Sequence, residues 1–164
     1  MGENITRDII ECVPEIEFDA GYRYFLGNMD NYLQAMLSIL KSMKAKLPLL
    51  ESMYRSGEFT GLRTITQTLR RMMNNVGAMG MAELSYQLES FLLNDQNTEF
   101  NELLDQYIRC MYRFTDHLEN LFMELGTKNI GRLNEEQSSF LNYDFTKTKE
   151  SIKLSTDLLE RRII

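Results

Sequence analysis

The chain has 164 residues and a net charge of −6, from 18 Lys and Arg against 24 Asp and Glu. This length suits one domain, and one histidine (His117) with two cysteines (Cys12 and Cys110) excludes the usual Cys/His zinc site and a disulfide scaffold. The acidity disfavours nucleic acid, whose affinity for proteins depends on neutralised phosphates. No apolar run is long enough to span a bilayer, and the acidic N-terminus does not resemble a signal peptide. We expect a cytoplasmic protein with no metal, cofactor, nucleic-acid or membrane partner.

Apolar residues recur at helical spacing through most of the chain, and no stretch alternates apolar and polar residues as a strand does. Asn28 can cap a long helix, and Pro48 should kink that helix rather than end it, because the apolar pattern continues past it. Gly27, Gly77 and Gly126 mark helix ends. In chain order we predict helices over residues 18–26, 29–55, 60–75, 81–93 and 98–125, a loop over 94–97, and a weaker helix over 135–161.

These elements predict an all-α fold with three parts. Residues 15–126 form an up-down four-helix bundle with a short helix on its N-terminal side, because long amphipathic helices with short connections pack best against antiparallel neighbours. Residues 1–14 precede it as an N-terminal segment. Residues 127–164 form a C-terminal helical extension that packs on the bundle, on a second copy or on another partner. The bundle is favoured, because elements adjacent in sequence usually pack together.

The segment from Thr64 to Glu89, TITQTLRRMMNNVGAMGMAELSYQLE, is more specific than the others. It resembles the signature of histidine-containing phosphotransfer (HPt) domains, the four-helix bundles that pass phosphate between histidine and aspartate in phosphorelays. The residues at family positions are Leu69, Arg70, Asn75, Val76, Gly77, Ala78, Leu84, Leu88 and Glu89. The similarity extends upstream to Phe18–Asp19, Gly27–Asn28 and Asn31–Leu33 and covers about residues 15–125. It implies the HPt fold.

The decisive position departs from the family. The resemblance places the phosphate-accepting histidine at residue 67, which is Gln67, and a glycine at residue 71, which is Arg71. A glutamine amide is not nucleophilic and only donates or accepts hydrogen bonds. The resemblance therefore implies a pseudo-HPt protein, which is not an enzyme and has no catalytic residue.

Basic residues gather on the polar side of the third predicted helix, although the chain is acidic overall. Helical spacing places five polar residues on one face: Arg63, Gln67, Arg70, Arg71 and Asn74. The opposite face is the expected core stripe: Leu62, Ile65, Leu69, Met72 and Val76. Guanidinium groups suit carboxylates and phosphates. With the resemblance, this pattern predicts a partner-binding face for the receiver domain of a response regulator or hybrid kinase, or for a histidine kinase; the alternative is an ordinary solvated helix face.

Two other functions stay open. In the first, the chain is a structural or dimerising helical bundle that is unrelated to phosphorelays and self-associates through residues 127–164. In the second, the chain carries phosphate on another residue, and His117 is its only histidine. Its neighbours Phe114 and Leu121 place His117 at the edge of a core stripe, where a half-buried structural histidine is favoured over a phosphoacceptor.

Overall fold

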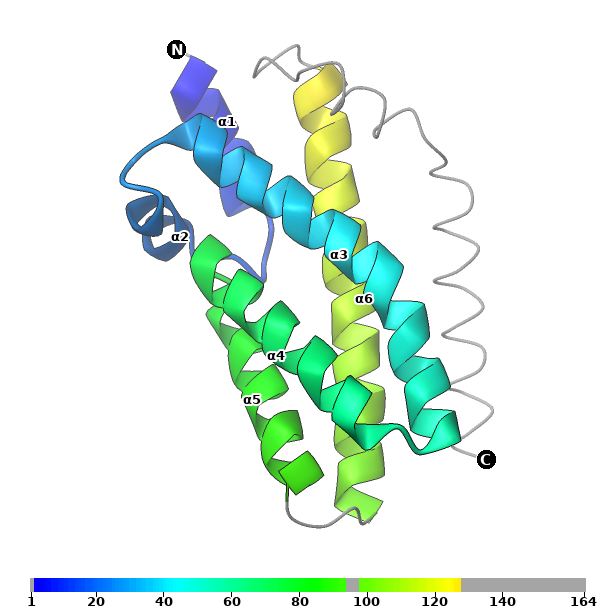
Figure 1. Cartoon of the computed structure of the whole chain (residues 1–164). Helices are drawn as coiled ribbons and strands as arrows, with labels where there is room; N and C mark the ends of the chain where they lie inside the picture. The colour runs from blue at the N-terminus through cyan, green and yellow to red at the C-terminus, as the bar shows by residue number, and fades with distance from the viewer. Residues whose placement is uncertain (1, 94–97, 128–164) are drawn as a thin grey trace.

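The computed structural model describes residues 2–93 and 98–127. Within these ranges the chain is all-helical, with six helices and no strand, so the predicted fold class is confirmed at this level. Figure 1 shows their arrangement. The helices are α1 (Gly2–Glu11), α2 (Phe18–Tyr24), α3 (Met29–Ser56), α4 (Phe59–Val76), α5 (Met79–Leu93) and α6 (Thr98–Thr127).

Helix α3 begins and continues as the sequence predicts. The Asn28 side chain caps it by accepting a hydrogen bond from the Asn31 backbone N–H at 3.0 Å. Pro48 lies inside the helix on its exposed side, and Leu50 beyond it is fully buried. The helix ends at Gly57, whose left-handed backbone (φ 78°) reverses the chain into α4.

A second left-handed glycine, Gly77 (φ 88°), joins α4 to α5 and also packs against α2. Its carbonyl accepts a hydrogen bond from the Glu17 backbone N–H at 2.9 Å. A Cβ atom at position 77 would lie 2.4 Å from the Glu17 carbonyl oxygen and 2.9 Å from the Gly21 nitrogen. Two backbones therefore meet here at a distance that only glycine allows.

The core lies among the four longer helices. Helix α3 packs against α4 and α6, and α5 packs against the same two helices (Figure 1). The interior is mainly Leu, Ile and Met with several Phe and Tyr, and Lys44 of α3 forms an ion pair there with Glu119 of α6. The largest fully buried side chains are Tyr32, Tyr107, Phe100, Phe114, Phe122, Ile10, Met36, Ile39, Leu40, Met43, Leu47 and Leu50.

Helix α1 was not predicted. The segment 1–14 reads as an acidic stretch interrupted by Pro14, yet residues 2–11 are helical and contact α6 and α2. Ile9 and Ile10 are buried, and Val13 follows them into the core. A ten-residue helix is marginal alone, and this one is stabilised by packing.

Smaller differences concern single residues. Met72 was expected in the core stripe of α4, but it is only partly buried and its neighbour Met73 is fully buried. One residue corresponds to about 100° around a helix, which is enough to exchange these two positions. Helix α2 ends at Tyr24, before the predicted end at Leu26, which is left-handed (φ 55°). Three predictions lie outside the described residues: the loop over 94–97, the helix over 135–161, and the extension over 127–164 except for its first residue.

Candidate docking face on helix α4

The five residues predicted to bind a partner all lie in α4. Arg63, Arg71 and Asn74 are exposed, while Gln67 and Arg70 are partly buried. Four of the predicted core residues of this helix, Leu62, Ile65, Leu69 and Val76, are buried. The structure therefore separates the polar face of α4 from its core face along the predicted division.

Arg70 differs from the other two arginines because it is held by the protein. Its Nε atom lies 2.9 Å from the Oε1 atom of Glu89 on α5, and its guanidinium carbon lies 5.8 Å from the centre of the Tyr86 ring. The Glu89 side chain is only 8% exposed. A buried carboxylate needs such a partner, so the main contribution of Arg70 is to the packing of α4 on α5.

Arg63 and Arg71 differ from Arg70 in their surroundings. Neither forms an ion pair with another residue that the structure describes. They stand eight positions apart with Gln67 midway, which corresponds to about 12 Å along the helix. An anionic group that approaches Gln67 would therefore meet one guanidinium on each side.

A polar cluster that the sequence pattern does not reveal lies behind this face. The buried Ser85 hydroxyl is 3.1 Å from the Tyr107 hydroxyl on α6, and it also contacts the Met81 carbonyl at 3.0 Å. Burial raises the pKa of Tyr107, the hydrogen bond with Ser85 lowers it in part, and the nearby charge of Glu89 raises it. Glu89 stands in the Leu-Glu pair of the motif, which is the one signal that could have marked it. Its partner Arg70 lies on another helix and is not evident from spacing.

A pocket of about 430 Å³ adjoins the docking face between α4 and α5. Arg70 and Asn74 line it from α4, and Met79, Ala82, Glu83 and Tyr86 line it from α5. Ala82 is 4% exposed. The predicted polar face of α4 thus continues directly onto α5, which helical spacing within α4 alone does not predict.

His117 lies away from this face, on α6. Its Nδ1 atom is 2.7 Å and 2.9 Å from the two carboxylate oxygens of Glu15, in the segment between α1 and α2. The His117 side chain is 29% exposed and that of Glu15 is 13% exposed. The half-buried position expected for this histidine is confirmed, and the contact connects the N-terminal part of the chain to α6.

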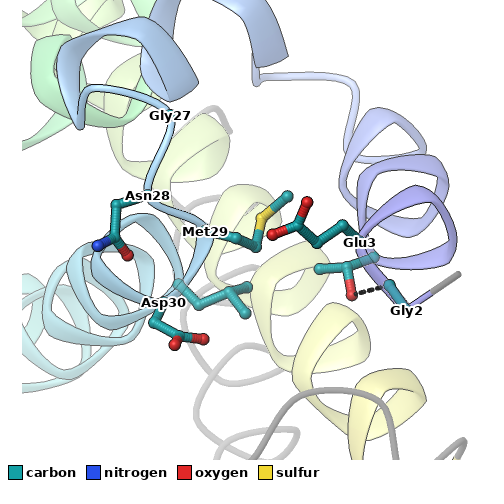
Figure 2. Close-up of a pocket in the computed structure, with 8 residues that line it drawn as sticks. Gly2, Glu3, Gly27, Asn28, Met29 and Asp30 are labelled. Carbon is teal, nitrogen blue, oxygen red and sulfur yellow. Dashed lines mark hydrogen bonds between the residues drawn. The ribbon is translucent and has the colours of Figure 1, made fainter.

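A second pocket, of about 500 Å³, lies between the beginnings of α1 and α3 (Figure 2). Glu3 and Asp30 bring carboxylates to it, and Met29 and Leu33 bring apolar surface. The residues that line it include no basic or aromatic side chain. It shares no residue with the docking face on α4.

Among the described residues, no group of three or more His, Cys, Asp or Glu side chains could hold a metal ion. None of the described helices is long and apolar enough to cross a membrane. Comparisons of the chain with family models, with curated proteins and with solved structures gave no match.

Proposed function

We propose that helices α3–α6 form an up-down four-helix bundle of the HPt type and that the chain is a cytoplasmic pseudo-HPt module. It binds a receiver domain, or a histidine kinase, through the face around Gln67 and carries no phosphate. The observation that carries this proposal is the placement of Gln67 between Arg63 and Arg71, two exposed cations without an ionic partner among the described residues.

The positions of the motif residues in the fold support the HPt resemblance. Leu69, Val76 and Leu88 are buried, as signature core positions require. Gly77 stands where two backbones touch, which gives the signature glycine a physical reason in this chain. Arg70 and Glu89, two polar positions of the motif, pair with each other.

The chemistry of residue 67 makes binding without transfer the expected activity. In an active HPt domain, an imidazole nitrogen attacks the phosphorus of an aspartyl phosphate, the P–N bond forms, and the P–O bond to the carboxylate breaks. The Gln67 amide cannot take this step, but it can hydrogen-bond an oxygen of the docked partner. Arginines on either side favour an acidic partner and speed its association. Such a module would compete with active HPt domains for receiver domains.

Binding of purified receiver domains from the same genome tests the docking face. We expect micromolar binding by the unaltered chain and at least tenfold weaker binding by the double variant Arg63→Glu/Arg71→Glu. The matched control is Arg109→Glu/Arg113→Glu, which changes two exposed arginines of α6. Equal loss in both double variants would reduce the effect to net charge, and no binding by any receiver domain would contradict the proposal.

A gain of function tests the assignment of residue 67. The variant Gln67→His/Arg71→Gly restores both positions at which the motif departs from the family. We expect it to take up acid-labile phosphate from a phosphorylated receiver domain, while the unaltered chain and Gln67→Ala/Arg71→Gly take up none. Phosphate on the unaltered chain would instead favour transfer through another residue, with His117→Gln as the test.

A further inference from the structure

Helix α4 carries positive charge that no residue of the same helix balances. Its 18 residues, FTGLRTITQTLRRMMNNV, contain three arginines and no Asp or Glu. One of the three is balanced from α5, because Glu89 pairs with Arg70. Arg63 and Arg71 have no ionic partner among the described residues. The docking face therefore presents two positive charges that the described part of the chain does not pair.

Gln67 adds an unused hydrogen-bond donor in the middle of this face. Its side-chain amide has no hydrogen-bond partner among the described residues. The hydroxyls of the adjacent Thr64 and Thr68 are already used, because they donate to carbonyls one turn back at 3.0 Å and 2.9 Å. Each of the two unpaired arginines is four positions from Gln67, and side chains at this spacing are neighbours on a helix surface. Two guanidinium groups and one amide can therefore converge on a single anion.

Charge distinguishes between the two kinds of anion that a protein partner could offer. A carboxylate has one negative charge and two oxygens, whereas a phosphoryl group has about 1.5 to 2 negative charges and three oxygens. Guanidinium forks bind pairs of phosphate oxygens, and an amide N–H can donate to a phosphate oxygen as well. One carboxylate would leave one of the two arginines without a counter-charge. The face therefore fits a phosphoryl group better than a carboxylate.

This arrangement is not part of the HPt resemblance. The resemblance implies a histidine at residue 67 and a glycine at residue 71, where this chain has Gln67 and Arg71. With a glycine there, Arg63 would be the only arginine of the face without an ionic partner. A glutamine amide is not nucleophilic, so a phosphoryl group bound beside it stays on the partner. The two departures together remove transfer and add a cation.

We propose that the docking face binds its partner preferentially in the phosphorylated state. Arg63, Arg71 and the Gln67 amide surround the phosphoryl oxygens of an aspartyl phosphate on the receiver domain, and no covalent bond forms or breaks. This inference rests on the proposed function and adds which state of the receiver domain is bound. The chain then sequesters phosphorylated receiver domains and leaves most of the unphosphorylated ones free.

The affinities for the two states of one receiver domain test this preference. The beryllofluoride adduct of the receiver domain represents the phosphorylated state, because it is a stable mimic of an aspartyl phosphate. We expect the full chain to bind the adduct about tenfold more tightly than the untreated domain, measured by titration calorimetry. Equal affinities would overturn this inference and leave the proposed function intact. Binding of neither state would contradict the proposed function, and this inference with it.

A control on the partner's side assigns the preference to the aspartyl group. A receiver domain whose phosphorylated aspartate is replaced by asparagine forms no adduct, so beryllofluoride should not change its affinity for the chain. A gain in affinity with this domain would place the effect elsewhere and overturn the inference.

Variants of the chain assign the preference to the docking face. The quantity compared is the ratio of the two dissociation constants, in which a general loss of docking cancels. Arg63→Gln/Arg71→Gln should bring this ratio close to one, and so should Gln67→Glu, which places a carboxylate of the same size against the phosphoryl group. Gln67→Met keeps the shape without the charge and should lower the ratio by about threefold. Arg109→Gln/Arg113→Gln, in exposed positions of α6, should leave it unchanged.

Two outcomes with these variants contradict the inference. If Arg63→Gln/Arg71→Gln retains the full ratio, the preference comes from a conformational change within the receiver domain. The single variant Arg71→Ala, which keeps a strong helix former at this position, should weaken binding of the adduct more than binding of the untreated domain. If it instead tightens binding of both states, Arg71 obstructs docking and does not bind the phosphoryl group.

Discussion

At the scale of single residues, the three arginines of α4 have unlike roles although the sequence presents them as one cluster. Arg63 and Arg71 face solvent, whereas Arg70 is tied to the buried Glu89 and lies near the Tyr86 ring. Periodicity predicts which side of a helix a residue occupies. It does not predict which neighbouring helix supplies a partner 19 residues further along the chain. The pairing of Arg70 with Glu89 depends on the packing of α4 on α5.

Arg70→Met should therefore act on stability. It leaves the Glu89 carboxylate buried without its cation, which we expect to cost about 2 kcal/mol in the free energy of unfolding, less than a fully buried pair because Arg70 is 30% exposed. The double variant Arg70→Met/Glu89→Leu should recover most of the loss, and Arg63→Met should change stability by less than about 0.5 kcal/mol. Urea unfolding checks all three. Equal stability of the two single arginine variants would show that the pair contributes nothing.

At the scale of elements, the sequence predicted long helices better than short ones. The stripes of α3, α4 and α6 fill the core, and the Asn28 cap and the glycine end of α4 lie where the pattern places them. Helix α6 instead continues through Gly126, where the sequence predicts its end, to Thr127. Helix α1 escaped prediction because its few apolar residues become significant only once α6 is there to pack against. The exposure of Met79, Tyr86 and Leu93 on α5 escaped prediction for the opposite reason, because apolar residues on a helix indicate a core position until the packing leaves them exposed.

The joint between α4 and α5 gives a sharp test of element packing. Gly77→Ala combines a left-handed backbone with a Cβ atom that would overlap the Glu17 carbonyl, and we expect it to lower the free energy of unfolding by about 3 kcal/mol. Gly80→Ala is the matched control. It lies in the first turns of α5 with open space around the new methyl group, and it should raise stability by about 0.5 kcal/mol. Thermal unfolding should show midpoints that move in opposite directions.

At the scale of the whole molecule, two buried tyrosines connect the helices. The Tyr32 hydroxyl of α3 donates to the Val76 carbonyl at the end of α4, at 2.7 Å, beside α2. Tyr107 of α6 reaches Ser85 of α5. Burial raises the pKa of both phenols above the ordinary value near 10. Both therefore stay neutral in the folded chain at pH values where they would ionise in the unfolded chain.

Stability should consequently fall in alkali. Below about pH 10 both phenols are protonated in both states, and their contribution is fully present. Above it, the unfolded chain releases protons that the folded chain keeps, so each tyrosine lowers the free energy of unfolding by about 1.4 kcal/mol per pH unit, until its folded-state pKa is reached. Lysines also titrate in this range, so the alkaline slope of the unaltered chain is compared with the slopes of Tyr32→Phe and Tyr107→Phe. Urea unfolding is measured between about pH 8 and 11, which brackets the ordinary phenol pKa. Each variant should reduce the alkaline slope by about the contribution of one phenol, whatever its constant cost at neutral pH. An unchanged slope would mean that the phenol ionises within the folded molecule. The contact of Tyr32 with α4, or of Tyr107 with α5, would then open before the chain unfolds.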